Sequence, residues 1–143
     1  MFLGEFEHSI DDKGRLSIPA KFRPALEDGL FITRGLDRCL VIWDGDSWRA
    51  MAERVRDLNP WQGDARRMQR HFFSGAVQAQ PDKLGRVVIP QYLREYAGLT
   101  NEVVVVGLAD RVEVWSQAEW ERERGQAEQD SAELAEHLAR AGS

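Results

Sequence analysis

The stretch Asp11-Asp12-Lys13-Gly14-Arg15-Leu16-Ser17-Ile18-Pro19 returns in altered form as Asp82-Lys83-Leu84-Gly85-Arg86-Val87-Val88-Ile89-Pro90. The two stretches lie 71 residues apart and share the pattern D-x-x-G-R-x-x-I-P. When residues 2–48 are aligned with the second half, allowing one inserted residue, 12 of 47 positions are identical. Ordinary residue usage predicts about 3 such matches by chance. The chain therefore contains two copies of one module.

Within each copy, periodicity predicts two strands, a short helix and two further strands. In the first copy residues 6–10 alternate apolar and polar side chains, Gly14 interrupts the alternation, and Leu16 and Ile18 resume it. This pattern is typical of a strand, a turn and a strand arranged like a hairpin.

The later part of each copy follows the same order. Proline suits the first turn of a helix, so Pro19 and Pro90 predict short helices over residues 20–26 and 91–97. Glycines after these helices are expected to end them. The apolar runs that follow predict a second strand pair in each copy, at residues 30–33 with 40–43 and at residues 103–106 with 112–115.

Helices are expected after each copy. Asp46 or Ser47 is the candidate cap of a helix that runs to Leu58, and residues 62–72 predict another short helix. Ser116 and Glu119 match a capping box, which predicts a long helix at the end of the chain. In that helix Gly125 is a candidate break, because an internal glycine costs about 1 kcal/mol.

Composition limits the class of protein. A chain of 143 residues is about one domain, and with 43% apolar and 30% charged residues it can bury a core. The sequence has no run of about 18 apolar residues, so we expect no transmembrane helix. Charged residues follow Met1 closely, which predicts a cytoplasmic location without a secretory signal. The single cysteine, Cys39, excludes a disulfide within the chain.

The net charge of −5 argues at first against a nucleic-acid partner, because phosphate binding needs local positive potential. The distribution of charge weakens this objection. Residues 116–143 carry seven acidic residues and three arginines, a net charge of −4, so residues 1–115 carry only −1.

The sequence offers no constellation for catalysis or metal binding. Its three histidines, His8, His71 and His137, have no spaced acidic or cysteine partners. It contains no G-x-S-x-G elbow, no Walker lysine loop and no G-x-G-x-x-G. We therefore expect no enzyme activity, no metal, no cofactor and no small-molecule substrate.

The repeated turn is the informative feature, and two interpretations of it stay open. In the structural one, Asp11 and Asp82 accept backbone hydrogen bonds, Gly14 and Gly85 supply a positive φ, and the arginines pair with the aspartates. In the functional one, the two turns present cationic donors to an anionic ligand. The candidate DNA-binding residues are Lys13, Arg15, Lys83 and Arg86.

The tryptophans are expected to be structural. Trp43, Trp48, Trp115 and Trp120 lie at predicted strand ends and helix starts, where a large ring packs between the two elements. Trp61 follows Asn59-Pro60 and is expected to anchor the segment between the modules.

Three segments together closely resemble the bacterial MraZ proteins, namely residues 1–6, 12–19 and 82–90. The resemblance covers nearly the whole chain, including its length and its duplication. A single D-x-x-G-R-x-x-I-P stretch would indicate only the wider AbrB-like, or SpoVT-AbrB, module. Two copies in one chain indicate MraZ.

This resemblance implies a transcriptional regulator with two AbrB-like swapped-hairpin modules, forming ring-shaped homo-oligomers and associating with the nucleoid. It implies binding to short promoter repeats of the division and cell-wall gene cluster, which includes its own gene, usually with repression. The family's D-x-x-x-R signature falls on Asp11 with Arg15 and on Asp82 with Arg86. Leu84 stands where the first turn has Lys13, so the two halves are expected to contribute unequally.

We therefore predict a mainly β fold with short helices (α+β). Two β-β-α-β-β modules interleave into a pseudo-twofold unit, because one short hairpin cannot bury its own faces. The predicted modules span residues 1–48 and 73–120, a helical linker spans 49–72, and an acidic C-terminal helix and tail spans 121–143.

The predicted partners are double-stranded DNA and further copies of the chain. The turn arginines are expected to bind phosphates or guanine edges, and several protomers on a row of repeats add avidity. The apolar residues Met51, Val55 and Leu58 exceed what one small domain covers, which predicts a homo-oligomer larger than a dimer. The alternative is an AbrB-fold protein-interaction or antitoxin-like module, whose turns contact a partner protein.

Overall fold

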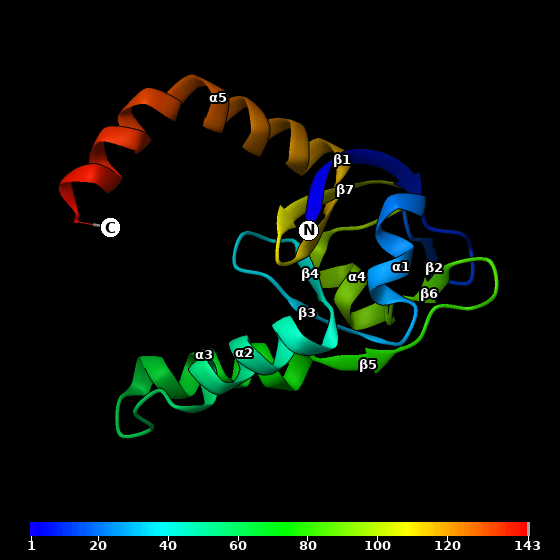
Figure 1. The fold of residues 1–143 in the computed structure, drawn as a ribbon, viewed down its shortest axis with the longest axis horizontal. Helices are drawn as coiled ribbons and strands as arrows, with labels where there is room; N and C mark the ends of the chain where they lie inside the picture. The colour runs from blue at the N-terminus through cyan, green and yellow to red at the C-terminus, as the bar shows by residue number, and fades with distance from the viewer. Residues whose placement is uncertain (143) are drawn as a thin grey trace.

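Two interleaved halves build a six-stranded antiparallel sheet and a two-stranded ribbon (Figure 1). This computed structural model describes residues 1–142, and Ser143, the last residue of the predicted tail, lies outside it. The strand order of the sheet is β1-β7-β8-β4-β3-β5, and β2 pairs with β6 in the ribbon. The strands are β1 (Phe2–Ser9), β2 (Arg15–Ser17), β3 (Leu30–Arg34), β4 (Leu40–Trp43), β5 (Val77–Ala79), β6 (Arg86–Val88), β7 (Glu102–Ala109) and β8 (Val112–Ser116). The helices are η1 (Ala20–Phe22), α1 (Arg23–Leu26), α2 (Gly45–Arg56), α3 (Gly63–Gly75), α4 (Gln91–Ala97) and α5 (Gln117–Arg140).

The first strands of each copy pair with strands of the other copy. β1 pairs antiparallel with β7, and β5 pairs antiparallel with β3. The hairpin is therefore swapped, as the family resemblance implied, and β1 and β2 share only an isolated bridge between Ile10 and Leu16. The physical reason is burial, since a short hairpin leaves its apolar face in water, whereas the pairing of β2 with β6 leaves Leu16 fully buried.

Two register positions define the pseudo-twofold axis. In the ribbon, Leu16 lies opposite Val87, its equivalent at the 71-residue offset. At the centre of the sheet, Val41 lies opposite Glu113, its equivalent at the 72-residue offset. The predicted α+β fold, duplicated and interleaved about a pseudo-twofold axis, is confirmed.

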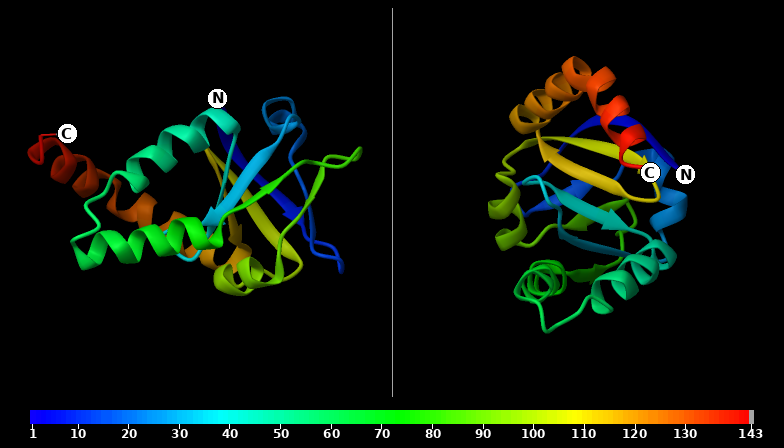
Figure 2. Two further views of the ribbon diagram at one scale, coloured as in Figure 1. Left: turned by 90° about the horizontal axis from the view of Figure 1, so that it is seen from below. Right: turned by 90° about the vertical axis from the view of Figure 1, so that its left-hand side faces the viewer.

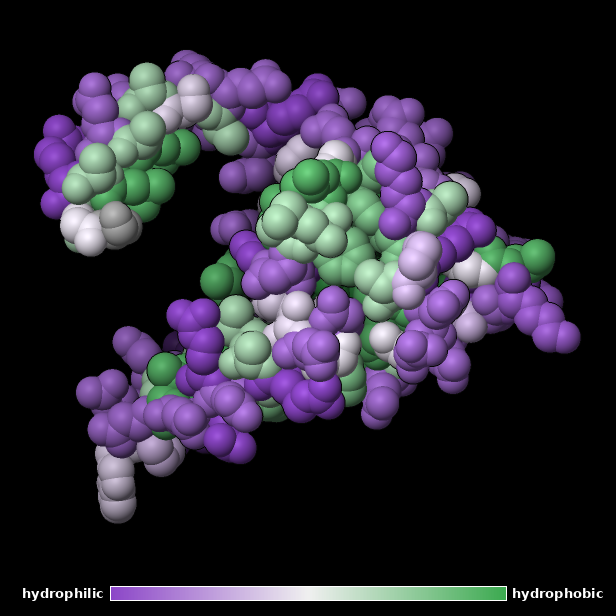
Figure 3. All heavy atoms as spheres, viewed as in Figure 1, coloured by the Kyte–Doolittle hydropathy of each residue, from purple (hydrophilic) through white to green (hydrophobic). Residues whose placement is uncertain are grey.

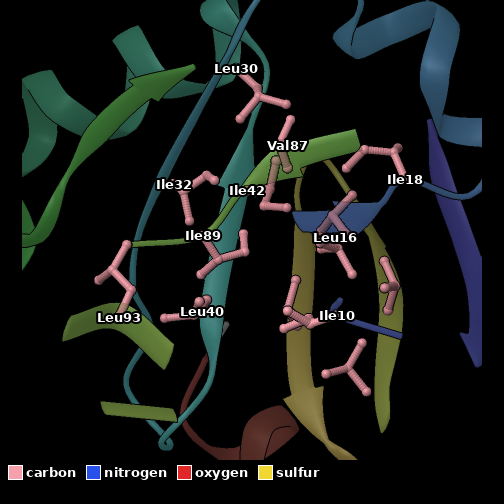
Figure 4. Close-up of a cluster of buried hydrophobic side chains, with 14 of the residues drawn as sticks. Ile10, Leu16, Ile18, Leu30, Ile32, Leu40, Ile42, Val87, Ile89 and Leu93 are labelled. Carbon is pink, nitrogen blue, oxygen red and sulfur yellow. The ribbon is translucent and has the colours of Figure 1, made fainter. Parts of the chain in front are cut away.

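The main hydrophobic core lies between the sheet and the ribbon and draws on both copies (Figure 4). Leu16 and Ile18 from the first copy and Val87 and Ile89 from the second are at most 2% exposed. The opposite face of the sheet carries two smaller hydrophobic clusters, one around Trp43 of β4 and one around Trp115 of β8. Every residue of β4 is buried, as expected for a strand covered on both faces.

The short helices follow the predicted spans with corrections at their ends. α4 covers residues 91–97 and is followed by Gly98 in the left-handed conformation (φ 63°). The equivalent segment of the first copy is a 3-10 turn followed by α1, because Pro24 inside it has no N–H to donate. Asp44, rather than Asp46 or Ser47, caps α2, where its carboxylate accepts a hydrogen bond from the Ser47 N–H at 2.8 Å.

The last helix is continuous over the predicted span. The capping box is confirmed, since the Ser116 hydroxyl oxygen accepts a hydrogen bond from the Glu119 N–H at 3.2 Å. α5 then continues through Gly125, so the predicted break is wrong. The cost of an internal glycine, about 1 kcal/mol, is too small to end a helix that has about two turns before it and about four after it. No helix among residues 1–142 is both long and apolar enough to cross a membrane.

Aromatic rings join the helices to the sheet, as predicted for four of the five tryptophans. Trp48 of α2 stacks on Phe31 of β3, with ring centroids 4.7 Å apart. In the second copy, Trp115 of β8 and Trp120 of α5 lie 5.8 Å apart and form another contact between strand and helix. The predicted anchoring role of Trp61 is wrong, because its side chain is 90% exposed.

The apolar side chains of α2 are mostly covered within one chain. Val55 is 8% exposed, and Met51 packs against the same cluster, beside Phe72 of α3. Only Leu58, at 38% exposure, remains open among the three residues expected to need a second subunit. The hairpin of α2 and α3 thus covers most of the apolar surface from which a homo-oligomer was predicted.

The residue on the pseudo-twofold axis provides a stability test. Leu16→Ala removes a fully buried side chain and should lower the free energy of unfolding by about 2–5 kcal/mol. Val88→Ala truncates a 56% exposed side chain on the other face of the same ribbon and should change it by less than about 0.5 kcal/mol. Urea unfolding of both variants measures the difference, and equal losses would contradict the placement of the core.

Candidate nucleic-acid interface

Two tight turns connect β1 to β2 and β5 to β6, and the aspartate of each repeat organises its turn. In the first turn, Asp11 Oδ1 accepts hydrogen bonds from the backbone N–H groups of Lys13 and Arg15, at 3.0 and 2.9 Å. Asp11 Oδ2 accepts a third from Arg15 Nε at 2.6 Å. In the second turn, Asp82 accepts the three equivalent hydrogen bonds, each 2.9 Å long. The two turns thus have the same internal structure.

Each turn also needs its glycine. Gly14 has φ 79° and Gly85 has φ 77°, in the left-handed region that favours glycine. A guanidinium from the other copy lies against each turn: a Cβ at Gly85 would lie 2.5 Å from Arg23 Nε, and one at Gly14 would lie 3.1 Å from the Arg94 guanidinium carbon. The turns therefore pack across the pseudo-twofold axis.

Arg23 and Arg94 belong to this surface, although the turn motif alone did not indicate them. Arg23 Nε donates to the Ile18 carbonyl at 2.8 Å, and Arg94 Nε donates to the Ile89 carbonyl at 3.0 Å. These bonds hold each guanidinium over the turn of the opposite copy. Their identity in both halves of the alignment was the signal that could have found them.

The predicted arginines share one face of the ribbon. In the β2–β6 register Arg15 lies opposite Val88 and Ser17 lies opposite Arg86, while Leu16 between them points to the core. Because side chains alternate along a strand, these four residues face outward together. Figure 1 shows the ribbon and both turns at one end of the molecule, away from the α2–α3 hairpin.

The size of the ribbon suits a DNA groove. The Ile89 N–H donates to the Gly14 carbonyl and the Ile18 N–H donates to the Gly85 carbonyl, so the turns flank the ribbon at its two ends. Gly14 and Ile18 are four residues apart, which places the turns about 13 Å apart along the ribbon at 3.3 Å per residue. The major groove of B-DNA is about 12 Å wide and admits a two-stranded ribbon.

Positive charge gathers at this end of an acidic chain. The two turns together with Arg23 and Arg94 carry six cationic side chains and three carboxylates, Asp11, Asp12 and Asp82. Two of those carboxylates are occupied by the ion pairs that close the turns. The arginine side chains in these pairs are only 29% and 27% exposed, so part of each guanidinium faces the protein and part faces solvent.

The turn hydrogen bonds also change the acidity of the aspartates. The Arg15 backbone N–H is the main cause that lowers the pKa of Asp11 below its ordinary value of 3.8, and the Arg15 guanidinium lowers it further. The Arg86 backbone N–H lowers the pKa of Asp82 in the same way. Both carboxylates are therefore held ionised by the folded turn.

Comparison with known proteins identifies the family. The model of the MraZ family, described as "MraZ protein, putative antitoxin-like", matches residues 1–71 and again residues 72–141. The chain belongs to the MraZ family. The "Transcriptional regulator MraZ" of Desulforamulus reducens is 47% identical over 138 residues, covering 96% of this chain and 97% of that protein.

Other MraZ relatives align over the same length. The "Transcriptional regulator MraZ" of Natranaerobius thermophilus is 44% identical, covering 96% of both chains. That of Desulfitobacterium hafniense is 47% identical, covering 99% of both chains. Among solved structures, "The solution structure of PHS018 from pyrococcus horikoshii" matches at 17% identity over 80% of this chain and 88% of that chain, with a TM-score of 0.34, which is too low to bear on the fold.

The two turns of this MraZ chain are not equivalent in charge. Lys13 aligns with Leu84, and Lys83 aligns with Asp12, so the lysines project from different positions of the two turns. Leu84 is 64% exposed. The structure brings Arg15 and Arg86 to matching positions, and it places the lysines asymmetrically beside them.

The lowered aspartate pKa predicts an acid-sensitive step in stability. A carboxyl whose pKa is lower in the folded chain stabilises the fold above its unfolded pKa, about 4, and this contribution is lost as pH falls through the folded pKa. The unfolding free energy should therefore fall below about pH 5, and Asp11→Asn should flatten that fall. Asp12→Asn, the neighbouring exposed carboxyl, is the matched control and should keep the parent profile.

Urea unfolding across a pH series measures both variants. A parent profile that does not change between neutral and acidic pH would contradict the role of the turn carboxylates.

Proposed function

We propose that this chain is a DNA-binding transcriptional regulator that contacts the major groove through the β2–β6 ribbon and its two turns. The observation that carries the proposal is the shared outward face of Arg15 and Arg86, flanked by Lys13 and Lys83. The names of the MraZ relatives support the regulatory role. A regulator of this kind is a binding protein rather than an enzyme.

Each cation has a distinct task in this proposal. Arg15 and Arg86 use Nε to hold the turn aspartate, which leaves their terminal nitrogens to donate to phosphates or to guanine O6 and N7. Lys13 and Lys83 are exposed at the turn tips, where a point charge suits a phosphate. The half-buried Arg23 and Arg94 support the turns and add positive potential.

The finer points of the proposal come from the family resemblance. The target is a row of short repeats in the promoter of the division and cell-wall gene cluster, including the chain's own promoter, and the outcome is repression. Copies of the chain assemble into a ring in the cytoplasm and associate with the nucleoid. The division into modules at 1–48 and 73–120, a linker at 49–72 and a tail at 121–143 stays a prediction.

Salt dependence tests the ribbon as the DNA surface. Each phosphate neutralised contributes about −0.9 to the slope of log affinity against log salt concentration. Anisotropy with a fluorescent fragment from upstream of the gene should give a steep slope for the parent. Arg15→Ala and Lys13→Ala should bind more weakly with shallower slopes, because each loses a contact in every engaged protomer.

Two controls separate binding from folding. Arg54→Ala removes the same charge from an exposed position of α2 and should leave affinity and slope unchanged. Lys13 contributes only its backbone to the turn, so Lys13→Ala should keep the parent far-ultraviolet circular dichroism. A flat slope in the parent would favour the protein-interaction or antitoxin-like alternative, and DNase footprinting upstream of the gene locates the repeats.

A further inference from the structure

A shallow groove on the α3 side of the molecule exposes apolar surface beside arginine. It is lined by Leu36, Asp64, Arg67, Met68 and His71, from the loop between β3 and β4 and from one face of α3. Leu36 is 72% exposed and Met68 is 36% exposed. This groove lies outside the ribbon and its turns.

The pseudo-twofold axis makes the exposure of Leu36 unusual. Its counterpart in the second copy is Leu108, which packs against the cluster of Cys39, Val104 and Trp115. The same position of the fold is therefore covered in one half of the chain and open in the other. Together with Met68, the open Leu36 gives the groove a contiguous apolar surface, the kind of surface on which proteins interact.

α5 carries a complementary surface. Leu134 and Leu138, four residues apart, share one face of the helix and are 48% and 56% exposed. No residue of α5 is buried along its 24 residues. Figure 3 shows apolar side chains gathered on the side of α5 that faces the hollow between it and the α2–α3 hairpin. A water-soluble helix of this length gains most of its stability from packing one apolar face.

The charges around the two surfaces are opposite. α3 carries Arg66, Arg67 and Arg70 against Asp64, and among residues 1–142 none of these arginines forms an ion pair. The second half of α5 carries three acidic side chains, Asp130, Glu133 and Glu136, and one arginine. Of these acids, Glu133 and Glu136 have no ion pair within the described chain. Of these arginines, Arg67 lines the groove, and unpaired carboxylates flank the apolar stripe of α5.

We propose that the second half of α5 of one copy docks into the Leu36–Met68 groove of the next copy. Leu134 fills the apolar floor, and Glu133 faces Arg67 at the rim. The proposal rests on the assembly of several copies in the proposed function and names the surfaces that join them.

The geometry makes this contact intermolecular and head-to-tail. Figures 1 and 2 show α5 and the α2–α3 hairpin leaving the body as separate projections, so the end of α5 does not lie in the groove of its own chain. Each copy offers one helix and one groove, which are different surfaces. A heterologous contact of this kind propagates and closes into a ring when the rotation between copies permits. The β2–β6 ribbons of neighbouring copies then belong to one assembly, which can bind several repeats of a promoter at once.

Matched pairs of variants test each surface without DNA. Leu134→Asp should reduce the oligomer of the parent to a 16.3 kDa monomer in analytical ultracentrifugation. Ala132→Asp adds the same charge two residues away, on the opposite side of the helix, and should keep the parent mass. On the groove, Arg67→Glu should give a monomer, and Arg70→Glu, off the groove face, should keep the parent mass. Leu36→Asp is a second groove variant in a loop, where no helix is perturbed.

Mixing the two monomeric variants tests the head-to-tail arrangement. The Leu134→Asp chain retains an intact groove, and the Leu36→Asp chain retains an intact α5. Their equimolar mixture should form a species of twice the monomer mass and nothing larger. A mixture that stays monomeric would overturn the pairing of these two surfaces.

Other outcomes also decide the proposal. Variants that keep the parent mass would place the interface elsewhere and leave the ribbon proposal standing. A parent that sediments as a monomer at micromolar concentration would overturn both the docking and the avidity it supplies. Binding of a promoter fragment is measured separately: docking-deficient chains should retain single-site binding with the parent's dependence on Arg15, which distinguishes failure of the interface from failure of the DNA surface.

Discussion

Pairing of β2 with β6 removes Leu16 and Val87 from water at the pseudo-twofold axis, and strands of three residues have little other means of stabilisation. Burial of these apolar side chains ties the two halves of the chain together, because each half supplies one strand of the ribbon. The exchange of β1 and β5 between the halves extends the same constraint to both edges of the sheet. Most of the fold follows from this requirement, since the core beneath the ribbon is shared and neither half could close it alone.

The candidate DNA surface is a consequence of that ribbon. An alternating strand that buries Leu16 must point Arg15 and Ser17 away from the core, and β6 repeats the arrangement with Arg86 and Val88. The structural and functional interpretations of the turn are therefore compatible. The Nε of each arginine donates a hydrogen bond to the aspartate of its turn. This hydrogen bond holds the guanidinium in one orientation, in which it can bind an external anion. Preorganisation of this kind lowers the entropy lost when a side chain binds.

The two copies differ most in the helices that follow them. The first is followed by α2 and α3, which fold back on each other and cover Val55 and Phe72 within the chain. The second is followed by a single long helix with no buried residue and most of the net negative charge. Acidic charge is thereby kept on a helix that leaves the body away from the ribbon, which reduces repulsion of DNA phosphates by a chain whose net charge is −5.

The sequence by itself determined the duplication, the order of elements within each copy and the identity of Asp11, Gly14, Arg15 and their counterparts as turn residues. The periodicity of apolar residues and the positions of glycines are local properties, so they can be identified in the sequence alone. The pattern of side chains could not decide which strands pair, because a local hairpin and a swapped one have the same alternation. The family resemblance implied the swapped pairing, and only the tertiary structure decided its register. It also decided that Arg23 and Arg94 reach the opposite turns and that Met51 and Val55 are covered by α3. These contacts join residues far apart in the chain, and their free energy comes from burial across the pseudo-twofold axis and between helices, which no short stretch of sequence encodes.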